Sequence, residues 1–347
     1  MNKRPKRGIY DLQISSLQGI LLIALISWGG LIPFFSIGQS LGRNIWVAYL
    51  LNFGMGLIYF FFLKEIAKAY PHSTLTAINQ EVFGKKWGQV VNIIFLLQFI
   101  SALSYYIMSG IYFWTSLQVH SMPIYVMGIL IVILLIFAGK MGLEVIARSS
   151  LFISLFITIM AFGDTILVAE EMDFARFLPI ADISWSGTME AALNYFTCQF
   201  ILMPLIFMFI PFIADINKKK AQPKQSAKII FWGIFIPSIY LLLNIIRNVT
   251  LFGDSIFIEY YPTVQALRMV EWNTAVIRLE TIGFLAIISI SLSFLMLLFY
   301  CSCRIAADIC QKRDHRKMLW PLGIISLLLL AIIYTQTDFI NDSLILS

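Results

Sequence analysis

Charged residues are scarce in this 347-residue chain, since Asp, Glu, Lys and Arg make up 13% of it while 59% is hydrophobic. A soluble globular domain carries about 25% charged residues and a smaller apolar share. The mean hydropathy of +0.84 excludes an ordinary water-soluble domain and places the chain among membrane proteins.

Histidine and cysteine, the usual residues of metal and nucleophile sites, are also rare. The four cysteines all lie in or beside apolar helical stretches, which argues against a disulfide framework, and Cys301 and Cys303 are poorly spaced for a metal. No phosphate-binding glycine loop is present, and no nucleophile has an evident base. The sequence predicts no catalytic centre, no metal site and no cofactor, so an enzyme is not expected. The three histidines, in or near predicted loops, are His72, His120 and His315.

What the chain has instead is long apolar runs, each of about 17 residues or more and thus long enough to cross a bilayer as a helix. The sequence predicts an all-α polytopic membrane protein with nine spans. They centre on residues 14–38, 44–63, 88–118, 122–139, 144–168, 188–214, 227–252, 275–304 and 319–335.

The basic residues fall mainly on one side of these spans. All but five of the 25 Lys and Arg residues lie in the N-terminal tail or in alternate loops, and INKKKAQPKQSAK alone holds five lysines. The positive-inside rule therefore predicts a cytoplasmic N-terminus and an outer C-terminus, so the net charge of +6 orients helices and does not indicate nucleic-acid binding. The five outer basic residues are Arg43, Arg176, Arg247, Arg268 and Arg278.

The first span contains helix breakers at membrane depth, because residues 27–33 read SWGGLIP. Such breaks are tolerated where protein or a water-lined cavity satisfies the freed backbone groups. A simple kink or close packing at small residues is the alternative. Many transporters, however, are built from inverted repeats whose first helices are broken and bind substrate.

The sixth span would open the second repeat of a five-plus-five arrangement, and it too is interrupted. It carries Thr197, Cys198 and Gln199 ahead of Pro204, with Pro211 further on. No carboxylate lies in the core of either broken helix, so a cation held there by an acid is not expected.

Other polar residues lie at membrane depth in the third, fifth and eighth spans. Gln98 and Ser101 recur at helical spacing with Tyr105, and Ser289 and Ser293 share one helix face. These residues could line a cavity, although a serine can equally satisfy its hydroxyl on its own helix. Asp164, in the fifth span, lies toward the outer end, where hydration lowers the free-energy cost of a carboxylate. A role for it in proton transfer is therefore the less favoured interpretation.

The chain resembles a known family in fragments spread along its whole length. They are QISSLQGI with a glycine-rich break and Pro33, AYPHSTLTAINQEVFGKKWGQVVN, GLEVIARSS, RFLPI, YYPTVQALRMVEW, IRLET and WPLGII. In their order and spacing these fragments are similar to the GerAB-like permeases, the B subunits of bacterial endospore germinant receptors, in the amino acid, polyamine and organocation superfamily.

The resemblance implies a single integral membrane domain over residues 1–347 with an inverted-repeat (LeuT/APC-type) helical bundle. Residues 1–170 would form the first five-helix repeat and residues 171–347 the second. It also implies a spore inner-membrane subunit that senses a small germinant, often an amino acid, together with an A-type subunit and a C-type lipoprotein. Matched by position, the ligand-binding residues would be Trp28, Gly29, Gly30, Gln98, Ser101, Cys198, Gln199, Ser289 and Ser293.

The resemblance predicts ten helices, but only TQTDFINDSLILS follows the ninth span, too little for the roughly 20 apolar residues of a tenth. The second repeat is thus expected to be incomplete at its C-terminus. Three functions remain open at this point: a germinant sensor, an amino-acid permease using the same pocket, and a truncated, poorly functional family member.

Overall fold

The computed structural model describes residues 14–29, 39–117, 122–178, 184–213, 223–258, 261–269, 279–312 and 314–345. Within these residues the chain is helical and forms no β-strand; an isolated bridge joins Ile14 to Ile213. Eight of its helices are long and apolar enough to cross a membrane. The prediction of an all-α polytopic membrane protein is confirmed.

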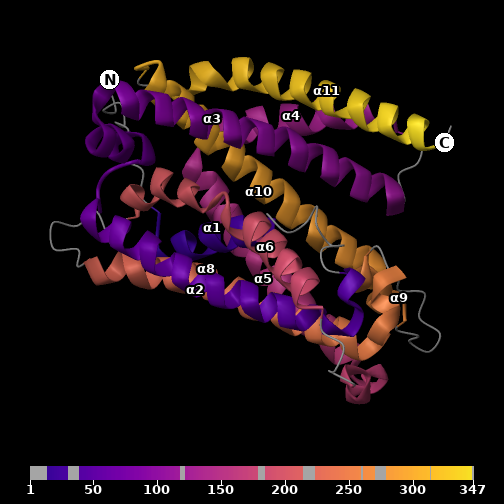
Figure 1. Ribbon diagram of the computed structural model, residues 1–347. Coiled ribbons are helices and arrows are strands. Elements are labelled where there is room, and N and C mark those ends of the chain that lie inside the picture. The colour runs from indigo at the N-terminus through magenta and orange to yellow at the C-terminus, as the bar shows by residue number, and fades with distance from the viewer. Residues whose placement is uncertain are drawn as a thin grey trace, which may run out of the picture.

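The long helices are α2 (Ile45–Ala69), α3 (Leu75–Leu117), α4 (Ile124–Met141), α5 (Leu143–Leu167), α8 (Pro223–Phe252), α10 (Leu279–Ile309) and α11 (Leu319–Ile345), together with α6 (Trp185–Phe200) and the turns that continue it. Helices α3, α4 and α11 form one group, and α2, α6 and α8 form another (Figure 1). Helix α10 crosses diagonally between the groups and packs against α3, α4, α5 and the short α1 (Ser16–Gly29), which also packs against α5 and α8.

The predicted first span is shorter as a described helix than the apolar run that contains it. Helix α1 has 14 residues, and residues 30–38 lie outside the described part of the chain. At 1.5 Å per residue, α1 is about 21 Å long, which is less than the roughly 30 Å of a hydrocarbon core. Trp28 and Gly29 at its end are buried, so the described helix stops inside the bundle.

The sixth span is interrupted near its prolines. Helix α6 ends at Phe200, and the chain continues as the 3₁₀ helices η6 (Met203–Met208) and η7 (Ile210–Phe212). Pro204 and Pro211 each occupy one of the first two positions of these turns, where the missing N–H costs least. The whole segment from Met203 to Met208 is buried except at Pro204, so it runs through the core of the molecule.

Of the helices that extend beyond the predicted apolar runs, α3 and α11 do so by the most residues. Helix α3 begins at Leu75, inside a predicted loop, and contains a sharp bend at Gly84, whose φ of 77° favours glycine. Helix α11 runs to Ile345, although its apolar run was predicted to end at residue 335. An apolar run locates the part of a helix inside the bilayer, and the helix itself can continue beyond it.

Short 3₁₀ turns gather at one end of the bundle. They include η3 (Gln39–Asn44), η4 (Ala169–Glu171), η5 (Phe174–Phe177) and η8 (Gly253–Ile258), and the short helix α9 (Pro262–Arg268) lies nearby, against α8 and α10. An ion pair between Arg43 and Asp254 joins η3 to η8, and Arg43 also donates to the carbonyl of Leu178. The turn η3 is thus anchored to the end of α8.

Candidate functional site

The backbone at the end of α1 lies against a side chain of α10. A β-carbon added at Gly29 would overlap the Cβ and Cγ atoms of Phe294, so only glycine allows this approach. The neighbouring polar groups, Ser27 Oγ and Trp28 Nε1, are buried and have no hydrogen-bond partner in the part of the chain that the structure describes. A buried polar group without a partner is unusual and indicates a functional or hydrated place. Gly30, also predicted for this site, lies outside the described residues.

Aromatic side chains from three further helices surround this helix end. Phe294 packs edge-on against Tyr106 of α3 with ring centroids 5.0 Å apart, and Trp28 packs edge-on against Tyr240 of α8 at 5.9 Å. Cys198 of α6 is buried in an apolar cluster with Tyr49 of α2 and Val249 of α8, and α6 itself packs against α1. The end of α1 is therefore the point where α3, α6, α8 and α10 converge.

The third-helix residues predicted for the site lie elsewhere on α3. Gln98 is half-buried and Ser101 is exposed, whereas Tyr106 contacts Phe294. The helical spacing of Gln98, Ser101 and Tyr105 was read correctly as one face, but that face is the more exposed one. Tyr106 follows Tyr105 directly in the sequence, and it is the one of the two whose ring packs against Phe294.

The serines of α10 satisfy their hydroxyls on their own helix. Ser289 donates to the carbonyl of Leu285 at 2.6 Å, and Ser293 donates to the carbonyl of Ser289 at 2.7 Å. These bonds do not need a ligand, although each oxygen keeps acceptor capacity. Ser293 directly precedes Phe294, so of the two it lies nearer to the end of α1.

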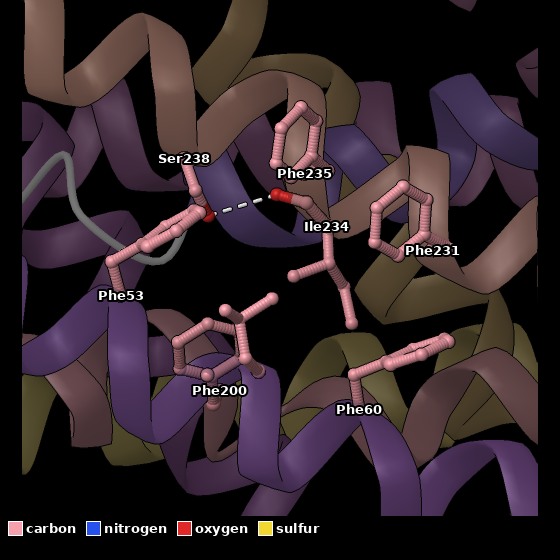
Figure 2. Close-up of a pocket in the computed structure, with 9 residues that line it drawn as sticks. Phe53, Phe60, Phe200, Phe231, Ile234, Phe235 and Ser238 are labelled. Atoms are coloured by element: carbon pink, nitrogen blue, oxygen red, sulfur yellow. Dashed lines mark hydrogen bonds between the residues drawn. The ribbon is translucent and has the colours of Figure 1, made fainter.

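Gln199 belongs to a buried network that joins α2, α6 and α8. Its Oε1 accepts from Asn52 at 2.9 Å, and its Nε2 donates to Ser238 Oγ at 3.0 Å. Ser238 in turn donates to the carbonyl of Ile234 (Figure 2), and Tyr49 donates to the carbonyl of Ser238. Both polar atoms of the Gln199 side chain thus have protein partners. This arrangement is typical of a residue that holds helices together.

Beside this network lies a crevice of about 250 Å³ between the same three helices. Aromatic rings form most of its wall, with Ser238 at one corner (Figure 2). The rings are those of Phe53, Phe60, Phe200, Phe231 and Phe235. Because the wall offers few polar groups, this crevice lacks the means to orient a polar ligand.

An ion pair buried among the helices was not foreseen from the sequence. Asp164 Oδ2 of α5 lies 2.6 Å from Arg247 Nη1 of α8, and their side chains are 10% and 1% exposed. Arg247 also donates from Nε and Nη2 to Asn248 Oδ1 at 3.2 and 3.0 Å. The sequence showed both charges but not that the two helices bring them together.

Asp164 lines a cavity with an empty volume of about 620 Å³ between α5, α8, α9 and α10. Most of its wall is aliphatic, and its polar side chains are Asp164, Tyr240 and Thr263. The cavity lies beside the end of α1. Trp28 shares an apolar cluster with Ile157 and Ile290 of the cavity wall, and its ring packs edge-on against Tyr240. The remaining lining residues are Met160, Gly163, Leu167, Leu267, Ile282, Gly283, Ala286 and Ile287.

Groups of three or more His, Cys, Asp or Glu residues that could hold a metal are absent from the described residues. All four cysteines are free thiols.

These features define an integral membrane protein of the polytopic helical class, with an interrupted sixth span and a first described helix whose last residues are buried in the bundle. The family model described as spore germination protein matches residues 13–340. The chain belongs to this spore germination permease family, which confirms the resemblance found in the sequence fragments, and a role in germination follows from that membership. It is 20% identical over 313 residues to spore germination protein KB of Bacillus subtilis (strain 168), a match that covers 88% of this chain and 82% of that relative.

Proposed function

We propose that this chain is the germinant-sensing B subunit of a spore germinant receptor and binds a small molecule, an amino acid first of all, at the end of α1. The observation that carries the proposal is the buried end of α1 at Gly29, with Ser27 and Trp28 offering polar atoms that lack partners among the described residues. The C-terminal end of a helix carries partial negative charge and free carbonyls, which suit a ligand ammonium group.

The receptor context belongs to the same proposal. The subunit would lie in the spore inner membrane with its N-terminus in the cytoplasm and act with an A-type subunit and a C-type lipoprotein. The excess of Lys and Arg on one side of the spans supports this orientation. A ligand would trigger germination by binding one arrangement of the helices more tightly than another, because only differential affinity shifts such an equilibrium.

A deletion strain tests the proposal when its spores are challenged with a panel of amino acids, sugars and nucleosides. Loss of the response to one compound, restored by the wild-type gene, is the expected result. Complementation with Gly29→Val should fail, whereas Gly54→Val should succeed, because Gly54 is exposed on α2 and no described residue approaches its β-carbon position. Deletion spores that germinate normally with every compound in the panel would refute the sensor function.

An amino-acid permease is a second candidate, and the Asp164–Arg247 pair is the observation in its favour. Ionisable residues inside membrane spans often mark transport pathways and proton relays. Uptake of radiolabelled amino acids into vesicles, with and without a pH gradient, measures this activity directly. Saturable uptake that Asp164→Asn abolishes, together with normal germination of the deletion strain, would favour the permease over the sensor.

A further inference from the structure

Asp164 occupies a position that is unfavourable for a carboxylate in two ways. It lies in the last turn of α5, where the helix dipole disfavours negative charge, and its side chain is only 10% exposed. A buried ion pair seldom stabilises a protein more than apolar residues of the same volume would. The position of the Asp164–Arg247 ion pair beside a cavity therefore indicates a role other than stability.

The ion pair is oriented with its negative member toward the cavity. Asp164 lines the cavity, whereas the guanidinium of Arg247 is 1% exposed and lies behind the carboxylate, held by Asn248. Oδ2 of Asp164 meets Arg247, and Oδ1 accepts from Thr165 Oγ1 at 3.2 Å. A carboxylate has about four acceptor positions, so a donor that enters the cavity finds a carboxylate able to receive it.

The remaining wall suits a compact apolar body. Its aliphatic side chains come from α5, α9 and α10, and the hydroxyls of Tyr240 and Thr263 are the other polar groups among the described lining residues. Thr263 Oγ1 donates to Asn244 Oδ1 at 2.9 Å and accepts from Asn248 Nδ2 at 3.4 Å, which leaves one acceptor position on its oxygen. The empty space of about 620 Å³ includes the part open to solvent, so the cavity suits a compact ligand of a few heavy atoms.

The cavity also lies near one end of the bundle. Asp164 is close to the C-terminus of α5, and the backbone N–H of Asp173, just beyond that helix, donates to the carbonyl of Thr250 near the end of α8. Short turns and α9 border this end. The Asp164 side of the cavity therefore lies toward that end of the bundle.

We propose that this cavity is a binding site for an ammonium compound with a compact apolar body, its cationic head at Asp164 and its body against the aliphatic wall. This site is separate from the germinant site proposed at the end of α1 and does not depend on it. An occupant would contact Ile157, Tyr240 and Ile290, which also pack around Trp28. Binding in the cavity can therefore shift the side chains that hold the end of α1 in place.

The test uses the full chain in phosphatidylcholine nanodiscs and radiolabelled 3-methylbutylammonium as the probe. Saturable binding to the wild type is expected, with 3-methylbutan-1-ol a competitor weaker by at least about tenfold because it lacks the charge. Asp164→Asn should weaken probe binding by about tenfold or more. Gly163→Leu should do the same by occupying the cavity, since no described residue approaches the β-carbon position of Gly163.

Gly54→Leu is the matched control, because it makes the same change on an exposed helix face away from the cavity and should bind the probe as the wild type does. A second set of nanodiscs containing phosphatidylethanolamine separates the two sources of ammonium. Competition by this lipid identifies a lipid headgroup as the occupant, whereas unchanged probe affinity identifies a free solute.

Three results would each overturn the proposal. They are no saturable binding by the wild type at millimolar probe, unchanged affinity in both Asp164→Asn and Gly163→Leu, and equal competition by the alcohol. If Asp164→Asn fails to fold, Gly163→Leu still decides the question, because it leaves the ion pair intact.

Discussion

The ring of Phe294 occupies the space that any side chain at Gly29 would need. Helices α1 and α10 therefore meet with backbone against ring, and the contact fixes how deeply the end of α1 sits in the bundle. We expect Gly29→Ala to destabilise the protein by about 1–3 kcal/mol through overpacking and to impair the germination response. Membrane abundance and spore germination measure the two effects.

A compensating change at Phe294 tests whether this contact is the cause. Phe294→Leu alone removes ring contacts with Tyr106, and in combination with Gly29→Ala it provides room for the added methyl group. The double variant should regain part of the stability lost by Gly29→Ala. A double variant whose loss equals the sum of the two single losses would show that the contact with Phe294 is not responsible.

The network at Gln199 leads to a prediction that separates a structural role from ligand binding. Gln199→Leu removes the acceptor of Asn52 Nδ2 and one of the two hydrogen bonds of Ser238 Oγ, and an orphaned buried group costs about 1–3 kcal/mol. We expect a clear loss of unfolding free energy in detergent micelles. Gln98→Leu on α3 is the matched control: the Gln98 side chain is half-buried and forms no hydrogen bond with another described residue, so its change should stay within about 0.5 kcal/mol. A stable Gln199→Leu variant that has lost germinant response would instead support a direct ligand contact.

Removal of one partner of the buried ion pair should be more costly than removal of both. Asp164→Leu leaves the guanidinium of Arg247 buried without its counter-charge, at a cost of about 3–5 kcal/mol. The double variant Asp164→Leu with Arg247→Leu should be much closer to the wild type, because neither charge remains in the core. A double-mutant cycle on thermal unfolding in detergent measures the coupling, and additive losses would contradict a direct pair.

Two glycines outside the candidate sites should respond in opposite directions to the same substitution. Gly84 has φ 77° and ψ 166°, a conformation almost restricted to glycine, so Gly84→Ala should destabilise the bend in α3 by about 1–3 kcal/mol. Gly54 lies inside the helix α2 with an exposed position, so Gly54→Ala should stabilise by about 0.5–1 kcal/mol. Unfolding curves of the two variants under identical conditions check both signs, and equal effects would argue against a backbone cause at Gly84.

Part of the candidate site was accessible from the sequence because it depends on local properties. The breaks in the first and sixth spans were predicted from SWGGLIP and from Pro204, since glycine and proline act on their own stretch of backbone. The described helix α6 ends at Phe200, before Pro204, whereas residues 30–38 of the first span lie outside the described part of the chain, and Trp28 and Gly29 are buried at the end of α1. The binding roles of the nine predicted residues, and the inverted-repeat relation of the two halves, stay predictions.

The sequence by itself determined the membrane class, the approximate positions of the spans and the family, because an apolar run of sufficient length and a set of ordered fragments are properties of one stretch of chain at a time. Only the tertiary structure decided which polar groups meet. Asp164 pairs with Arg247, Gln199 with Asn52 and Ser238, and Phe294 lies against Gly29. These relationships depend on how helices distant in sequence rotate and cross, and helical periodicity describes each helix without fixing its rotation toward its neighbours.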